Sequence, residues 1–248
     1  MIKMLRQLII TVMGNVDSGK TQLLDTIRNT VIAESEPGKI TQCIGCSHIP
    51  LDTIKKICGD LLLKSKMDIR IPGFVIIDTP GHAAFTNLRR RGGNLADIAV
   101  VVIDINDGIK PQTMECIDIL KQYKTPFVIA LNKIDLLPGW ASNSKTLLLE
   151  NIQKQGEQAM LLIEKRLYEI VGKLSEFGFN SERFDRVEDY AKQIAIIPAS
   201  AKTAEGLPEL LMVMVGLSQK FLEQNLKVDA KGYAKGTVLE VKEEKGLG

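Results

Sequence analysis

Residues 14–21 read Gly14-Asn15-Val16-Asp17-Ser18-Gly19-Lys20-Thr21. An apolar run over 8–12, typical of a buried strand, comes before them, and apolar residues at helical spacing follow in 21–29. The glycines allow successive backbone N–H groups to turn toward one point, where they can surround an anion. A strand, a glycine-rich turn and a helix are the setting in which the pattern G-x-x-x-x-G-K-[ST] binds nucleotide phosphates. The stretch therefore predicts a phosphate-binding loop at the centre of an α/β fold.

Two side chains at the end of this loop have defined roles in a phosphate site. Lys20 would reach the β- and γ-phosphates, and the Thr21 hydroxyl would bind Mg²⁺. The positive end of the following helix adds a favourable field at the same place. We expect nucleotide contacts from the loop and the first helical turn: Asn15, Val16, Asp17, Ser18, Gly19, Lys20, Thr21 and Gln22.

The composition is that of a soluble globular protein. Of 248 residues, 45% are apolar and 25% are charged, and the net charge is +2. This length can bury one sizeable core and the start of another. The sequence has no apolar run long enough to cross a bilayer and no secretory signal after Met1. We therefore expect a cytoplasmic protein with no membrane partner, whose small net charge does not by itself indicate nucleic acid.

The four cysteines are expected to be free thiols, because a chain of this class does not depend on disulfides. Cys43 and Cys46 form a C-x-x-C pair, with His48 and Cys58 nearby in the sequence. Such a group could hold a metal ion. A structural zinc site, however, usually has four protein ligands, commonly arranged as two such pairs, so we favour free thiols.

Apolar runs recur along the chain and indicate strands that are buried on both faces. They are rich in Ile and Val and cover 74–77, 98–103, 127–131 and 194–197. Helical spacing appears between them, in 51–63, 113–123 and 207–222. Strands that alternate with helices predict a mostly parallel central sheet, with helices on both faces and ligands at the carboxyl ends of its strands. Residues 67–71, before a Pro-Gly pair, predict an antiparallel edge strand paired with 74–77.

Two segments depart from this alternation. Residues 143–192 place apolar side chains mostly three or four apart, which predicts an amphipathic helical insertion on the surface between two core strands. The tail alternates over 234–241 and ends in a glycine-rich turn, which predicts one strand of an all-β module. We therefore expect a nucleotide-binding domain over 1–225, followed by 226–248 as the truncated beginning of a second domain.

A second phosphate motif follows the strand predicted at 74–77. It reads Asp78-Thr79-Pro80-Gly81-His82. Asp78 can hold Mg²⁺ through a water molecule. Gly81 has no Cβ, so its N–H can approach a γ-phosphate closely and respond to its loss.

Two further motifs indicate guanine as the base. Asp135, in Asn132-Lys133-Ile134-Asp135, can accept hydrogen bonds from N1–H and the exocyclic amine of guanine, a donor pair that adenine lacks. This favours GTP over ATP, since a buried polar group left unpaired costs about 1–3 kcal/mol. Asn132 would bridge to the phosphate loop, and the stem of Lys133 would cover the base. Ser200-Ala201-Lys202, after 194–197, would offer a backbone N–H to guanine O6.

Together these motifs resemble those of the translational GTPases. The sequences in and around these motifs are similar to those of the initiation factor five-B family of archaea and eukaryotes. This family promotes ribosomal subunit joining and is related to bacterial initiation factor two. Four stretches carry the likeness: Ile40-Thr41-Gln42-Cys43-Ile44-Gly45, Asp78-Thr79-Pro80-Gly81-His82-Ala83-Ala84-Phe85, Arg89-Arg90-Arg91-Gly92-Gly93 and Asp104-Ile105-Asn106-Asp107-Gly108-Ile109-Lys110-Pro111-Gln112-Thr113. The resemblance is dense over 8–138, resumes at Pro198, and implies a P-loop NTPase of the Ras-like G-domain type followed by the first strands of a β-barrel domain.

The resemblance also implies catalytic roles. Thr41 resembles the switch I threonine that closes on Mg²⁺ and the γ-phosphate, and His82 resembles the histidine that orients the attacking water. Val16 and Ile40 match an apolar pair that screens this histidine. Asp17 matches an aspartate that holds a monovalent cation, Na⁺ or K⁺. The implied catalytic set is Lys20, Thr41, Gly81 and His82, and the implied metal ligands are Asp17, Thr21, Thr41 and Asp78.

The implied partners are the ribosome and initiator tRNA. The basic run 89–91 lies next to switch II, where it can meet ribosomal RNA of the large subunit or simply form a solvated helix face. Initiator tRNA would bind through a C-terminal region beyond this sequence, and we expect a monomer. Hydrolysis should be slow until a partner stimulates it, since no internal arginine finger is evident. Two alternatives stay open: a nucleotide-dependent docking module with negligible hydrolysis, and a GTPase that delivers a special aminoacyl-tRNA.

Overall fold

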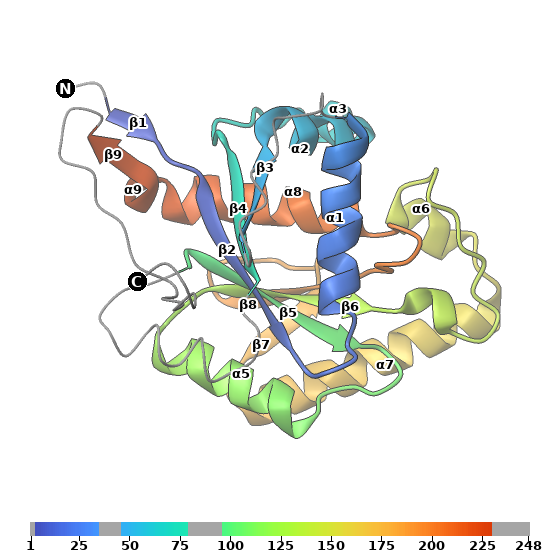
Figure 1. The fold of residues 1–248 in the computed structure, drawn as a ribbon. Coiled ribbons are helices and arrows are strands. Elements are labelled where there is room, and N and C mark those ends of the chain that lie inside the picture. The colour runs from blue at the N-terminus through green and yellow to red at the C-terminus, as the bar shows by residue number, and fades with distance from the viewer. Residues whose placement is uncertain (1–2, 35–45, 79–95, 230–248) are drawn as a thin grey trace, which may run out of the picture.

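The computed structural model describes residues 3–34, 46–78 and 96–229 (Figure 1). Its main sheet has seven strands in the order β3-β4-β2-β5-β6-β8-β7. Their bounds are β2 Leu8–Gly14, β3 Cys46–Pro50, β4 Gly73–Asp78, β5 Ile98–Asp104, β6 Phe127–Asn132, β7 Asn180–Arg183 and β8 Gln193–Pro198. Neighbouring strands run parallel except β3 and β4. The predicted mostly parallel sheet is confirmed. Strands β2, β4, β5, β6 and β8 fall on the predicted apolar runs, whereas β3 and β7 were not predicted.

The antiparallel edge strand is not the predicted one. Strand β3 pairs with β4 from Cys46↔Ile77 to Pro50↔Gly73, whereas residues 67–71 form no strand. The alternation of Met67, Ile69 and Ile71 resembles a strand pattern, but Ile69 and Ile71 are buried as irregular chain. The edge of β4 is already occupied by β3, so 67–71 has no backbone partner there.

Helices cover both faces of the sheet, as predicted. Their bounds are α1 Lys20–Glu34, α2 Leu51–Ile57, α3 Gly59–Ser65, α5 Pro111–Gln122, α6 Leu148–Gln153, α7 Glu157–Glu176 and α8 Leu207–Leu217. Figure 1 shows α1, α2, α3 and α8 on one side of the sheet, and α5 and α7 on the other. None of the helices in the described part of the chain is long and apolar enough to cross a membrane.

The segment predicted as a helical insertion has two different parts. Helix α7 buries Ile163, Leu167, Ile170 and Leu174 on one face. It lies between the parallel strands β6 and β8, which need such a crossover because parallel neighbours cannot be joined by a tight turn. The shorter stretch with α6, before α7, is additional to this crossover, and so is the edge strand β7, which pairs parallel with β8. The prediction of a wholly helical segment is wrong at β7, whose short polar sequence, Asn-Ser-Glu-Arg, has no strand pattern. The division of the chain into domains at residue 225 remains a proposal.

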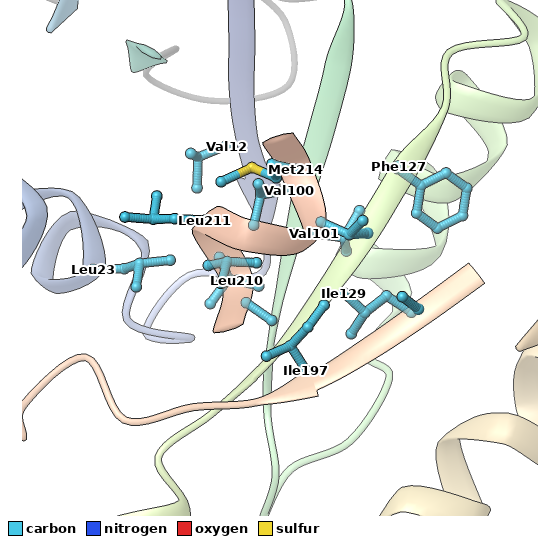
Figure 2. Packing of buried hydrophobic residues seen from close by; sticks show 14 of the residues in the cluster. Val12, Leu23, Val100, Val101, Phe127, Ile129, Ile197, Leu210, Leu211 and Met214 are labelled. Carbon is cyan, nitrogen blue, oxygen red and sulfur yellow. The ribbon is translucent and has the colours of Figure 1, made fainter. Parts of the chain in front are cut away.

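The core lies between the sheet and these two helical layers. Figure 2 shows Leu211 and Met214 of α8 beside Val12 and Val100 of the central strands. These four side chains are at most 4% exposed. Continuous apolar strands thus have both faces covered, which places polar loops at the strand ends.

A second, two-stranded sheet joins the two ends of the described chain. Strand β1 (Lys3–Leu5) pairs antiparallel with β9 (Lys227–Asp229), which follows the π-helix η2 (Ser218–Leu222) and α9 (Glu223–Leu226). The predicted strand over 234–241 lies outside the described residues.

Candidate nucleotide-binding site

The phosphate loop connects the carboxyl end of β2 to the start of α1. Gly14 has φ +140°, and a Cβ there would lie 2.3 Å from the carbonyl oxygen of Val102. Gly19 has φ +91°, and a Cβ there would lie 2.2 Å from Nδ2 of Asn132. Both positions therefore require glycine, for backbone conformation and for space.

The Lys20 ammonium group lies over this loop. Its Nζ donates to the carbonyl oxygens of Gly14 at 3.0 Å and Asn15 at 2.5 Å. Ser18 is buried, and its hydroxyl donates to the same Asn15 oxygen at 2.9 Å. The loop thus holds a cation at the amino end of α1, where the helix dipole also favours an anion.

The middle of the loop is open to solvent. Val16 is 62% exposed, and its backbone N–H donates to Oε1 of Gln112 at 2.9 Å. Asp17 has φ +64°, an uncommon conformation for a residue other than glycine. Gln112 of α5 was not predicted as a site residue, because only the folded chain brings it within reach of a loop 96 residues away.

Asn132 joins the phosphate loop to the predicted base loop. Its side chain is 1% exposed, and Nδ2 donates to the Ser18 carbonyl at 2.8 Å. Its Oδ1 accepts from the backbone N–H of Ala201 at 2.9 Å. The Thr26 hydroxyl of α1 donates to the Ala201 carbonyl at 2.5 Å. The segments that the sequence assigns to phosphate and to base are therefore joined by hydrogen bonds through one buried side chain.

The side chains predicted to bind the base also lie together. The Ser200 hydroxyl donates to Oδ1 of Asp135 at 2.7 Å, which fixes the orientation of this half-buried carboxylate. Lys133 has φ +69°, and its Nζ forms an ion pair with Oδ2 of Asp104 at 2.8 Å. Lys202 is exposed beside them in the chain. The Asp135 carboxylate can accept hydrogen bonds from two adjacent donors of a flat base, and the aliphatic chains of the lysines can lie against its ring.

The residues present fit a Mg²⁺–nucleotide complex. The Thr21 side chain is exposed at the end of the loop, next to the Lys20 ammonium in sequence. The backbone of Asp78 pairs with Val12, so β4 ends beside the strand that leads into the loop. Within the described ranges there is no cluster of three His, Cys, Asp or Glu side chains. A hydroxyl, a carboxylate and phosphate oxygens make up a magnesium site of this kind without such a cluster.

Several predicted residues lie outside the described residues. These are Ile40, Thr41, Cys43, Gly81, His82 and the run 89–91. The other cysteines, Cys46, Cys58 and Cys116, are free thiols. Burial raises the pKa of the Cys116 thiol to about 12, and hydrogen bonding with the Gly14 backbone opposes this only in part.

A cavity of about 500 Å³ lies elsewhere, between α3, α8 and η2. Its lining is mainly apolar and includes Leu61, Met212 and Phe221. None of its lining residues belongs to the predicted phosphate or base motifs. The assignment of the nucleotide site therefore rests on its donors, charges and backbone shape.

A family model matches most of the chain. Residues 5–220 match the model described as "Elongation factor Tu GTP binding domain". The match begins before β2 and ends within η2, so it includes the whole seven-stranded sheet.

Similar proteins include two archaeal proteins named "Probable translation initiation factor IF-2". The one from Methanopyrus kandleri is 56% identical over 246 residues, and the one from Thermococcus sibiricus is 53% identical over 247 residues. These alignments cover 99% and 100% of this chain. The chain spans only 41% of the length of each relative.

Solved structures agree with this likeness. GDP-bound aIF5B from Aeropyrum pernix has a TM-score of 0.88 and 49% identity, over 98% of this chain and 41% of that one. The apo elongation factor SelB from Methanococcus maripaludis, at 20% identity and a TM-score of 0.54 over 88% of this chain and 34% of that one, shares the fold. The chain therefore belongs to the elongation factor Tu GTP-binding domain family, a family of translational GTPases.

Proposed function

We propose that this chain is the nucleotide switch of an initiation factor that promotes ribosomal subunit joining. It binds GTP or GDP with Mg²⁺ and hydrolyses GTP when the ribosome stimulates it. The observation that carries the proposal is the pair of hydrogen bonds made by the Asn132 amide, which connect the phosphate loop to the base loop. A site with this connection can bind both ends of one nucleotide.

Guanine selectivity would come from Asp135. Its Oδ1 is held by the Ser200 hydroxyl, so the carboxylate presents a fixed edge to N1–H and the exocyclic amine of guanine. A backbone N–H of 200–202 would meet O6. The N–H groups of Ser200 and Ala201 already donate to the Glu205 carbonyl and to Oδ1 of Asn132, which favours the N–H of Lys202, and the Lys133 stem would lie over the ring. Adenine would leave the carboxylate without its donor pair, which accounts for the expected preference.

The phosphates would bind at the loop 14–19 and the amino end of α1. Lys20, whose Nζ is bonded to two carbonyl oxygens at the loop, would reach the β- and γ-phosphates. Mg²⁺ would be held by Thr21, Thr41 and Asp78, and when bound it would neutralise charge on the phosphates. Asp17 would supply a ligand for a monovalent cation, Na⁺ or K⁺.

Hydrolysis would depend on residues assigned by resemblance. His82 would orient the attacking water, and Thr41 and Gly81 would sense the γ-phosphate, so that its loss releases both switch segments. The exposed Val16 side chain supports a role as one half of the apolar screen, with Ile40 as the other half.

The partners are inferred from the names of the relatives and from the resemblance. We infer contact with the large ribosomal subunit near 89–91 and with initiator tRNA through a region beyond this chain, for a monomeric factor in the cytoplasm. The names "translation initiation factor IF-2" and "aIF5B" support initiation rather than delivery of a special aminoacyl-tRNA.

Two measurements test the proposal. Calorimetric titration with GDP, GTP and ADP in Mg²⁺ should give binding by the guanine nucleotides alone, and equal affinity for ADP would contradict the guanine assignment. Single-turnover GTP hydrolysis should be faster with ribosomes and should fall strongly in a His82→Ala variant of the full-length protein. Equal rates for the two proteins would leave a nucleotide-dependent docking module as the better description.

A further inference from the structure

The loop that follows β8 is closed by hydrogen bonds to Glu205. The backbone N–H of Ser200 donates to the Glu205 carbonyl at 2.9 Å, and the N–H of Thr203 donates to the Ser200 hydroxyl at 3.1 Å. Gly206 ends the loop with φ +75°, where a Cβ would lie 2.1 Å from the carbonyl oxygen of Pro198. The position of Ser200 therefore depends on where Glu205 is held.

The Glu205 carboxylate is buried and is bonded only to neutral donors in the described part of the chain. It is 4% exposed. Its Oε1 accepts from Nδ2 of Asn151 at 2.6 Å and from the backbone N–H of Asn143 at 3.0 Å. Its Oε2 accepts from the Thr203 hydroxyl at 2.6 Å. A buried carboxylate needs such partners, and they fix its position closely because each donor has a preferred direction.

Asn151 and Asn143 belong to the stretch around α6, outside the sheet. Asn151 is 3% exposed, and Gln155 beside it is 7% exposed. Gln155 donates from Nε2 to the Ala141 carbonyl at 2.9 Å and to Oδ1 of Asn151 at 3.1 Å. Its own Oε1 accepts from the Ala141 N–H at 2.7 Å. We call Asn151, Gln155 and Glu205 the α6 network.

The α6 network leads to the base site through Ser200. Glu205 holds the Ser200 backbone, and the Ser200 hydroxyl donates to the Asp135 carboxylate at 2.7 Å. A structural link alone could be made more cheaply by apolar side chains, since burying a carboxylate costs free energy even when it is bonded. A polar network has the advantage of fixing direction, which a bidentate contact to a base requires.

We propose that Glu205, held by Asn151 of α6, is a positioning residue for guanine recognition. This inference rests on the proposed function, because it assigns Asp135 to the base. The stretch around α6, which the sequence marks only as part of a surface insertion, then sets the orientation of the Asp135 carboxylate through Glu205 and Ser200.

The test compares GDP with inosine diphosphate, which lacks the exocyclic amine and so makes one hydrogen bond fewer to Asp135. In the wild-type chain GDP should bind more tightly. In Asn151→Leu and Glu205→Ala the ratio of the two affinities should contract by at least about threefold, because a misdirected carboxylate loses more with GDP than with the inosine nucleotide. Calorimetric titration of both ligands gives the ratio directly.

A conservative variant separates positioning from simple destabilisation. Glu205→Gln keeps an oxygen for Asn151 and Asn143 and can donate to the Thr203 hydroxyl, which rotates to accept, so it should restore the wild-type ratio. Ile163→Ala removes buried apolar volume in α7 and should lower the melting temperature while the ratio stays unchanged. If Glu205→Ala does not fold, the ratio of GDP to inosine diphosphate affinity can still be measured in Asn151→Leu and in Asn151→Asp. The second of these variants places a carboxyl group against that of Glu205.

The outcomes separate the two proposals. No guanine selectivity in the wild-type chain would overturn the proposed function. Wild-type selectivity that persists unchanged in Asn151→Leu and Asn151→Asp would overturn the positioning role alone. A contracted ratio in these variants, restored in Glu205→Gln and unaffected in Ile163→Ala, would support the role of the α6 network.

Discussion

Arg6 and Asp97 form a two-point ion pair, with Nη1 2.6 Å from Oδ2 and Nη2 2.7 Å from Oδ1. The same Oδ2 accepts from the backbone N–H of Ile9 at 2.8 Å. Arg6 follows β1, its backbone N–H donates to the Leu226 carbonyl, and Asp97 stands directly before β5. The pair therefore connects the β1–β9 sheet to the central sheet, and the Asp97 carboxylate raises the pKa of Arg6 by accepting its hydrogen bonds.

Replacing Arg6 by Met should lower the free energy of unfolding by about 1–2 kcal/mol, because a partly buried carboxylate loses two charge-assisted hydrogen bonds. Urea denaturation measures the loss. The matched control is Lys192→Met, which removes an exposed ion pair to Asp189 at 3.5 Å and should leave stability almost unchanged. Equal losses in the two variants would show that the Arg6 pair is an ordinary surface contact.

Gly19→Ala should weaken GDP binding by at least about tenfold. The methyl group would meet Nδ2 of Asn132, and a φ of +91° strains any residue with a Cβ. Gly172→Ala in α7 is the control, because outside the adjoining helix backbone no atom lies within 4 Å of the added carbon. It should leave affinity unchanged and stabilise the helix by about 0.5–1 kcal/mol. Titration of both variants with GDP tests the pair, and unchanged affinity in Gly19→Ala would argue against this loop as the phosphate site.

Asp135→Asn should exchange guanine for xanthine as the preferred base. The amide of asparagine can donate to the 2-oxo group of xanthine, whereas it meets the exocyclic amine of guanine donor to donor. GDP affinity should fall by about 10–100-fold and xanthosine diphosphate affinity should rise. Leu136→Asn, at an exposed neighbour, is the control that should change neither. Parallel losses for both nucleotides in Asp135→Asn would mean that the carboxylate supports the fold rather than reading the base.

Cys58 and Cys116 should resist alkylation in the native chain. Burial raises the pKa of each thiol to about 12, so both stay protonated at pH 8.5. The unfolded thiols ionise near the ordinary pKa of about 8.5, so the stability they contribute is full below that value and is lost as pH rises toward 12. Iodoacetamide labelling followed by mass spectrometry should modify both residues in urea and neither in buffer. Equal labelling rates would contradict their burial, and Cys58→Ala/Cys116→Ala should have a flatter stability profile between pH 9 and 12.

Strands β2, β4, β5, β6 and β8 of the central sheet could be predicted because each is a continuous apolar run. Residues 98–103 and 127–131 predict β5 and β6 to within a residue or two, since burial on both faces permits no other composition. Strand β3 reads Cys-Ser-His-Ile-Pro, is short and half-polar, and has no such signal. Its place depends on pairing with β4, a long-range contact that a local pattern does not encode.

The residues of the site likewise fall into those that a local motif identifies and those that only the folded chain brings together. The loop 14–21 and the residue Asp135 carry their chemistry in local motifs, so the sequence alone assigns them roles. Glu205 and Asn151 are 54 residues apart, and neither stands in a motif, so only folding brings the carboxylate and the amide together. The roles of Thr41, Gly81 and His82 stay predictions, because these residues lie outside the described residues.

The Asn132 amide donates at one end and accepts at the other, so its two hydrogen bonds polarise the same group and should strengthen each other. One buried side chain thus fixes the separation between the phosphate loop and the base loop, which is the distance that a single nucleotide has to span.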